Sequence, residues 1–520
     1  MNFKRNLLSI IALIGSTFAV SACFLQNNFK EYVPIEETPD ATEDEYGTGY
    51  VKPHTYSDYY AYDNDGTKKS IGNAYNVTSE YSKKKVLKPT GERKIIVIPV
   101  DFVDFTAYTL NVKTEEYVTN LKNAFFGSSS ANKYVSVAEY YNRSSYGKLR
   151  ITGKVLDQFY RFNTSVEEIN KGKEDKLVRE NLSNIYNWYE STYLVSSSEL
   201  KQSDTAIYLV YTLPTELGTE NPTFFWNYTF PDLRLCWSSY STMNTVSGSP
   251  DAHTFIHEVG HLFGLQDYYP TKQADQKPIE PTARIDMMDC SVGDHTAFSK
   301  MYLNWLKPTW IKDSCEISMK PLINSGDILL INDSWNGNVF DEYYLIEFYV
   351  PLGLNYFDSV NGNNMAKLPN LPGIKIYHVD ARLAYFTLKS EKASASNAYF
   401  ACYCDEVIPA EYEDKFIIDN KPLISFAHDN STPLSAPSGG SEEEEEETTS
   451  TTIKHLYELK LNHVSSGSAS GCASNVNLFR PGDTYDAEDF IFNKTNNTKY
   501  NISITGMTYE SARIKIEKVS

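Results

Sequence analysis

The chain has 520 residues, which is enough for two to four domains at about 150 residues each. Its 41% hydrophobic and 22% charged residues are ordinary for a globular protein and exclude a wholly disordered chain, a collagen and a multi-span membrane protein. With 67 acidic and 48 basic residues the net charge is −19, so general nucleic-acid binding is not expected, because phosphate contacts need clustered Lys and Arg.

The first 22 residues have the pattern of an export signal. A basic pair precedes a short apolar stretch at residues 7–20, which is too weakly hydrophobic for a spanning helix. Small residues then lead to Cys23, in a pattern that resembles a bacterial lipobox with Cys23 as the lipidated first mature residue. We therefore expect a lipoprotein signal peptide at 1–22 and an exported chain anchored to the cell membrane surface. An ordinary signal peptide with an incidental Cys23 is the alternative.

Residues 23–90 are polar and acidic and have no helical or strand period, which predicts a tether or a pro-like segment. Beyond them, short apolar runs typical of buried strands alternate with amphipathic helices. We predict strands at 94–100, 149–162 and 206–211, and helices that begin near 114 and include 178–185. This alternation indicates a domain of helices and strands at 91–310.

After residue 310 the pattern changes to short β-type runs separated by Pro and Gly. We predict strands at 328–331, 343–349, 373–379 and 512–516. These runs indicate a β-rich, sandwich-like domain at 311–520, so that the whole chain is of the α+β class. A low-complexity acidic loop at 431–452 contains six consecutive Glu residues, which repel one another and are expected to stay solvated.

Residues 249–267 carry the candidate chemistry. Ser249 is expected to cap a helix that Pro250 opens. His257 and His261 lie four residues apart, about 40° around the helix and one turn along it, so both imidazoles can reach one ion. With Glu258 they form the His-Glu-x-x-His arrangement of the zincins.

Each residue type in this arrangement has a chemical role. Neutral imidazoles bind Zn²⁺ well, and a catalytic site keeps three protein ligands and one position for water. Glu258, next to the first ligand, is expected to act as general base on the zinc-bound water. Gly264 is expected to end the helix, and Asp267 follows at the spacing of a third ligand. A carboxylate is a competent zinc ligand, although Asp267 could instead orient a ligand from outside.

These residues resemble the immune inhibitor A-type secreted zinc metallopeptidases, which are metzincin-like zincins. The matching segments are 257–269 (His-Glu-Val-Gly-His-Leu-Phe-Gly-Leu-Gln-Asp-Tyr-Tyr), 286–289 (Asp-Met-Met-Asp), 293–300, 303–306, 137–141, 145–149, 344–347 and 373–380. The resemblance runs from about residue 92 to 382 and is most specific around the helix.

The resemblance implies a metzincin-like catalytic domain with bound Zn²⁺. Met288 would be the Met-turn residue beneath the metal, with Met287 as the alternative. Asp267 is favoured as the third metal ligand and His295 is the alternative ligand. Tyr268 or the residue after it could donate a hydrogen bond to the oxyanion. The family also implies Ca²⁺, for which no Asp-rich loop is visible.

We therefore expect a membrane-anchored extracellular zinc endopeptidase that hydrolyses peptide bonds of extracellular protein or peptide substrates. The alternative is a non-catalytic surface lipoprotein, an adhesin or ligand-binding module on a protease-like scaffold.

Overall fold

The computed structural model describes most of the chain between residues 86 and 381 and the C-terminal region. The described residues are 86–165, 174–214, 227–243, 248–268, 282, 284–335, 337, 339, 341–363, 366–381, 473–490, 492 and 499–519, with the short strands β1 (Tyr50–Val51), β2 (Tyr59–Tyr62), β3 (Lys68–Gly72), β15 (Ala384–Leu388), β16 (Tyr399–Ala401), β17 (Phe416–Ile418) and β18 (Glu458–Leu461). The export signal, Cys23 and the acidic loop at 431–452 lie outside these residues. Among the helices of this part, none combines the length and apolar character needed to cross a bilayer.

The first part of the chain forms a mixed sheet with the order β5-β4-β7-β9-β8, and β6 also pairs with β4. The strands are β4 (Gly91–Phe102), β5 (Leu149–Val155), β6 (Tyr160–Phe162), β7 (Thr205–Tyr211), β8 (Tyr228–Phe230) and β9 (Leu235–Ser239). All pairs are parallel except β8–β9, which is antiparallel at the edge. The predicted strands are confirmed, but β8 and β9 escape prediction because neither contains a long apolar run.

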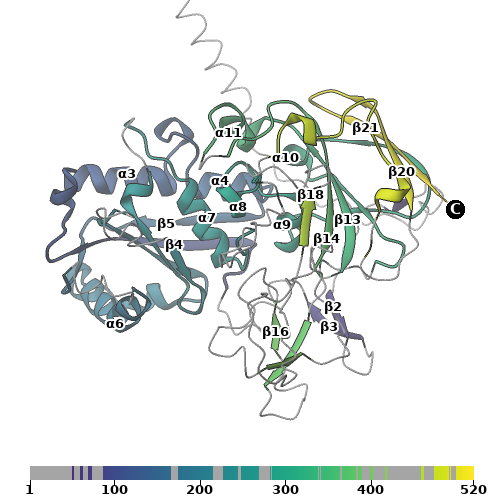
Figure 1. Ribbon diagram of the computed structural model, residues 1–520. Coiled ribbons are helices and arrows are strands. Elements are labelled where there is room, and N and C mark those ends of the chain that lie inside the picture. The colour runs from purple at the N-terminus through teal and green to yellow at the C-terminus, as the bar shows by residue number, and fades with distance from the viewer. Residues whose placement is uncertain are drawn as a thin grey trace, which may run out of the picture.

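Helices cover both faces of this sheet (Figure 1). They are α3 (Thr114–Phe126), α4 (Val137–Ser144) and α7 (His253–Leu262) on one face and α6 (Glu174–Tyr193) on the other. The alternation of side chains along β4 explains the two layers, since Ile95 and Val97 face α3, α4 and α7, whereas Ile96 and Ile98 face α6. Both faces are therefore buried, as expected for a largely parallel sheet.

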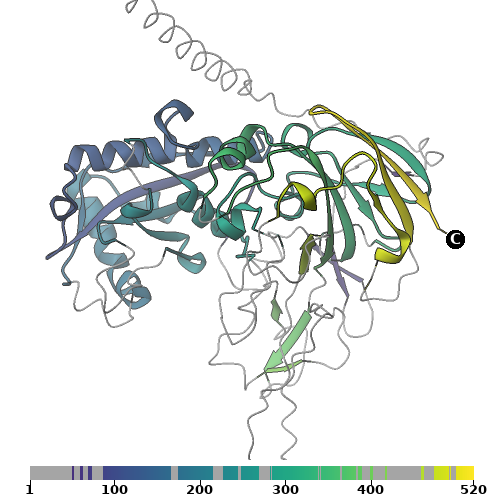
Figure 2. The same cartoon turned by 45° about the horizontal axis from the view of Figure 1, so that its top comes forward.

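Besides a small sheet with the order β16-β15-β17, the second part of the chain contains two larger sheets. The larger has the order β1-β10-β12-β13-β14-β18, and the smaller has the order β11-β21-β20-β19. Their remaining strands are β10 (Thr309–Ile311), β11 (Cys315–Met319), β12 (Ile328–Ile331), β13 (Glu342–Tyr349), β14 (Gly373–Asp380), β19 (Thr484–Tyr485), β20 (Tyr500–Met507) and β21 (Ala512–Lys518). Apolar residues of both sheets form one core, and Figure 2 shows β20 and β21 in yellow beside the green strands. The predicted strands of this part are confirmed.

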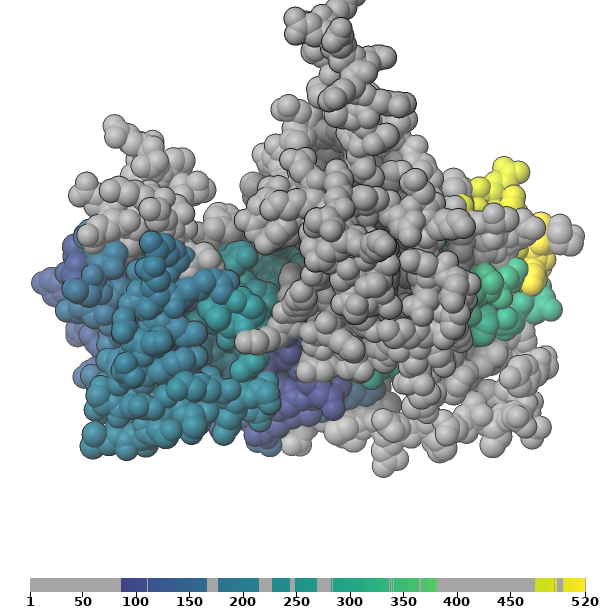
Figure 3. Space-filling model, turned by 90° about the horizontal axis from the view of Figure 1, so that it is seen from below, coloured from purple at the N-terminus to yellow at the C-terminus, as the bar shows by residue number. Residues whose placement is uncertain are grey.

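A central core joins the two parts of the chain. It contains Ile95 from the first sheet and Tyr343 and Leu345 from the larger second sheet. The short helices α8 (Met287–Cys290), α9 (Ala297–Tyr302), α10 (Leu322–Ser325) and α11 (Tyr356–Val360) lie between them. The expected domain boundary at 310/311 falls within β10. Leu87, near the end of the expected acidic segment 23–90, donates a backbone hydrogen bond to the carbonyl of Leu262 over 2.6 Å. From below, the two parts occupy opposite ends of the molecule (Figure 3). The fold is a mixed α+β arrangement.

Candidate metal centre

Helix α7, His253–Leu262, carries both histidines of the motif. The expectation that Ser249 caps it and Pro250 opens it is wrong, because the N–H of Asp251 bonds to the carbonyl of Met243 and holds residue 251 outside the helix. Asp251 Oδ1 instead accepts a hydrogen bond from the N–H of His253 over 3.2 Å. The helix ends as predicted, with Gly264 in the left-handed region at a φ of 90°.

The structure brings His257, His261 and Asp267 together. One ligand atom from each lies within 4.8 Å of the others. Asp267 Oδ1 is 2.9 Å from Nε2 of His257 and 3.4 Å from Nε2 of His261. The two rings lie nearly perpendicular, with their centroids 5.0 Å apart. The turn after α7 therefore returns the chain so that Asp267 faces both imidazoles.

Backbone carbonyls orient both rings. Nδ1 of His257 donates to the carbonyl of Met287 over 2.8 Å, and Nδ1 of His261 donates to the carbonyl of Leu265 over 2.8 Å. Because a carbonyl can only accept, the proton of each neutral ring resides on Nδ1. Nε2 of each ring is then the nitrogen that faces Asp267, and it is the atom that would lose its proton to bind a metal. Carbonyl partners of this kind are the usual support of metal-binding histidines.

The charges of the cluster are strongly coupled. Burial lowers the pKa of His257, but the hydrogen bond and charge of Asp267 outweigh it and raise this pKa to about 9. Burial raises the pKa of Asp267, yet the two histidines overcome this effect and hold that pKa far below its ordinary value. The carboxylate of Asp267 is thus ionised, as a metal ligand must be.

The donor set fits Zn²⁺. Two imidazoles and one carboxylate match the three protein ligands of catalytic zinc sites. Ligand atoms at about 2.0–2.1 Å from a tetrahedral ion are roughly 3.3 Å apart, close to the 2.9 and 3.4 Å that separate Asp267 Oδ1 from the two Nε2 atoms. In the described part of the chain, no other group of three or more His, Cys, Asp or Glu side chains converges in this way, so the expected Ca²⁺ has no assigned residues.

Glu258 is buried beside this cluster and is held by Thr229 of β8. The hydroxyl of Thr229 lies 2.8 Å from Oε2 of Glu258 and 2.9 Å from its backbone oxygen. Burial raises the pKa of Glu258, and the neighbouring histidines only partly offset this effect. Sequence reasoning does not find Thr229, because a threonine on a three-residue strand carries no recognisable signal.

Met288 packs directly beneath α7. A Cβ added to Gly260 would lie 2.5 Å from Met288 Sδ, so the sulfur fills the space that the glycine leaves. Asp286 Oδ1 accepts a hydrogen bond from the N–H of Met288 over 2.6 Å and fixes this turn. Met287 contributes its carbonyl to His257. Met288 therefore contacts the helix through its side chain, and Met287 contacts it through its backbone carbonyl.

Two other candidates that the structure describes, His295 and Tyr268, contact residues other than the three ligands. His295 is not among the converging ligand atoms, and its ring packs near Tyr140, Tyr141 and Trp305 with no hydrogen-bond partner among the described residues. Burial lowers its pKa well below the ordinary value. Tyr268 is buried and bonds to Ser299 Oγ over 2.7 Å, and the tyrosine after it lies outside the described residues.

Neither models of protein families nor curated protein sequences give a match to this chain. The argument for function therefore depends on the motif and on the geometry of the site.

Proposed function

We propose that the chain is a zinc-dependent endopeptidase, exported and anchored to the membrane surface through Cys23, that cleaves extracellular proteins or peptides. The observation that carries this proposal is the convergence of His257, His261 and Asp267 next to the buried carboxylate of Glu258. Three ligands with an acid beside them are what a hydrolytic zinc site requires.

The proposed mechanism assigns one role to each residue. His257 and His261 would hold Zn²⁺ through Nε2, and Asp267 through its carboxylate. When bound, the ion would supply the Lewis acidity that polarises the scissile carbonyl and acidifies a water molecule. Glu258 would accept a proton from the attacking water on its carboxylate and return it to the leaving amine. Thr229 would keep that carboxylate in place.

The edge of the first sheet supports a peptide as substrate. β8 is the last strand in the sheet order, so its outer edge pairs with no described strand. It carries Thr229, which contacts Glu258. An extended peptide added along this edge would form main-chain hydrogen bonds and bring its backbone past the catalytic carboxylate.

The architecture is compatible with a metzincin-like catalytic domain. A parallel sheet with one antiparallel edge strand, followed by the motif helix and a methionine turn beneath it, supports that assignment. The common core of the two later sheets supports a sandwich-like second domain.

Digestion of casein by the full chain, purified in detergent, tests the proposal. We expect cleavage that a zinc chelator abolishes and added Zn²⁺ restores. Glu258→Gln should retain zinc and lose about 10²–10⁴-fold in kcat, the usual contribution of general acid–base catalysis. Glu116→Gln, on the exposed face of α3, is the control and should digest like the parent. Zinc binding without any digestion would instead favour the non-catalytic surface lipoprotein.

A further inference from the structure

Asp358 of α11 is fully buried and bonds to two different elements of the first part of the chain. Its Oδ2 accepts a hydrogen bond from the N–H of Gly293 over 2.7 Å and lies 3.1 Å from Nε2 of His253. A carboxylate oxygen accepts, so His253 donates. The other oxygen, Oδ1, has no hydrogen-bond partner among the described residues. A single oxygen atom thus joins two elements far apart in sequence.

The first of these elements is α7. His253 is its first residue and lies one turn before His257. Nδ1 of His253 is 2.5 Å from Asp251 Oδ1, and its ring stacks on Tyr134 with centroids 4.0 Å apart. Because both nitrogens and a ring face are engaged, the start of the helix is held from three sides.

The second element is the segment 286–296, which we name the Met-turn loop. Its Met287 carbonyl orients His257, so a displacement of this loop would also displace a candidate metal ligand. Gly293 has a φ of 61°, and a Cβ there would lie 2.5 Å from Leu368 Cδ1 and 2.8 Å from Asn355 Oδ1. The loop backbone therefore approaches the second part of the chain more closely than any side chain would allow.

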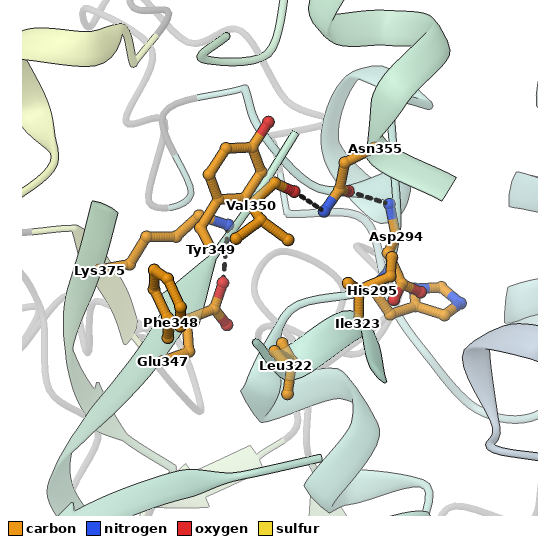
Figure 4. Close-up of a pocket in the computed structure, with 10 residues that line it drawn as sticks. All are labelled: Asp294, His295, Leu322, Ile323, Glu347, Phe348, Tyr349, Val350, Asn355 and Lys375. Atoms are coloured by element: carbon orange, nitrogen blue, oxygen red, sulfur yellow. Dashed lines mark hydrogen bonds and ion pairs between the residues drawn. The ribbon is translucent and has the colours of Figure 1, made fainter. Parts of the chain in front are cut away.

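Further contacts fasten the same junction (Figure 4). Asn355 Oδ1 accepts the N–H of Asp294 over 2.9 Å. Glu347 of β13 accepts the N–H of Ala297 over 2.8 Å and pairs with Lys375 over 2.7 Å. These groups hold the end of the loop, whereas Asp358 also contacts α7 through His253.

We infer that Asp358 is a positioning residue, through which the second part of the chain holds the active-site helix and the Met-turn loop in register. This inference rests on the proposed function for its catalytic meaning. It assigns the β-rich part a role in building the metal centre, in addition to any contact with substrate. The carboxylate touches neither the candidate ligands nor Glu258, so it acts through His253 and Gly293.

Amide hydrogen exchange and zinc affinity of the full chain test this inference. Asp358→Ala should accelerate exchange in residues 253–262 about tenfold without zinc and weaken zinc binding about tenfold, the lower end of the roughly 10–100-fold effect of losing a direct partner of a ligand. Asp358→Asn keeps an oxygen that can accept from Gly293, so it should recover part of both effects and it remains informative if the alanine variant does not fold.

Glu342→Ala is the matched control. Glu342 is also a buried carboxylate of the second part, and it pairs with His378 of the neighbouring strand over 2.9 Å. The Glu342→Ala variant should be less stable than the parent, but its amide exchange in residues 253–262 and its zinc affinity should stay within about twofold of the parent values. Equal effects of the two alanine variants, or none in Asp358→Ala and Asp358→Asn, would overturn the inference. If the parent protein binds zinc but does not digest casein, only the proposed function is overturned. The inference about Asp358 would still be tested, because amide hydrogen exchange is measured without catalysis.

Discussion

Thr229 holds the carboxylate of Glu258 from a strand 29 residues earlier in the chain, with its hydroxyl 2.8 Å from Oε2. The same hydroxyl lies 2.9 Å from the backbone oxygen of Glu258, so it ties both the side chain and the helix to the edge of the sheet. This contact links the strand that would receive the substrate to the group that would move the proton.

Replacing Thr229 by Val should therefore impair turnover more than binding. A hydrogen bond to a charged group contributes about 1.5–3 kcal/mol, so we expect kcat to fall roughly 10–100-fold with little change in KM. Steady-state kinetics on a quenched peptide substrate measures both values. Thr229→Ser keeps the hydroxyl and should recover most of the rate. A Val variant with the kcat of the parent would show that Thr229 does not hold the reacting carboxylate.

Zinc content distinguishes the two candidates for the third ligand. Asp267→Ala removes the carboxylate that lies 2.9 Å from His257, and we expect zinc affinity to fall at least about 100-fold. His295→Leu should leave zinc affinity within about twofold, because its ring lies outside the cluster. Chelator competition on both purified variants gives the affinities. A His295 variant that loses zinc while Asp267→Ala retains it would reverse the assignment.

Gly260→Ala should strain the contact between α7 and Met288 of the Met-turn loop. The new methyl group would lie 2.5 Å from Met288 Sδ and 3.3 Å from the hydroxyl of Tyr141. Overpacking of this kind costs about 1–3 kcal/mol, which exceeds the gain of up to about 1 kcal/mol from helix propensity. Urea denaturation should thus show a lower midpoint.

Combining Gly260→Ala with Met288→Ala tests whether that contact is the cause. Removing the sulfur makes room for the methyl group, so the two changes should destabilise less together than the sum of their separate effects. Strict additivity would place the strain elsewhere.

The stability of the protein should depend on pH through His253. Burial lowers the pKa of His253, but Asp358 and Asp251 outweigh it and raise this pKa to about 10, against about 6.5 in an unfolded chain. The folded state binds the proton more tightly, so the stabilisation is complete below about pH 6.5 and is lost as the pH rises toward 10. Lys133, 3.1 Å from Asp251, is the other charged group at this contact.

His253→Gln measures this contribution. At pH 6 it should lower the free energy of unfolding by about 3–5 kcal/mol, because it leaves buried carboxylates without their charged partner. The difference in the free energy of unfolding between parent and variant, measured by urea denaturation, should become smaller as the pH rises from 7 to 10. A constant difference over that range would mean that His253 is not protonated in the folded protein.

Much of the fold follows from local patterns in the chain. The run Ile95–Val100 is long and apolar enough to predict β4, and the spacing of Val118, Leu121 and Phe125 predicts α3. Prediction failed where neighbours outside the segment decide the conformation. The start of α7 is the clearest case, since a hydrogen bond from Asp251 to Met243 prevents Ser249 and Pro250 from joining the helix.

Some residues of the candidate site also follow from the sequence, whereas the groups that hold them do not. His257, Glu258 and His261 lie within five residues on one helix, so the sequence alone determined that two imidazoles share a face with an acid beside them. Asp267 was predictable from its distance beyond Gly264. Only the tertiary structure decided which groups hold these residues, because Thr229, Met287 and Asp358 come from other elements. Hydrogen bonds between distant segments depend on packing of the whole core, and no local spacing encodes them.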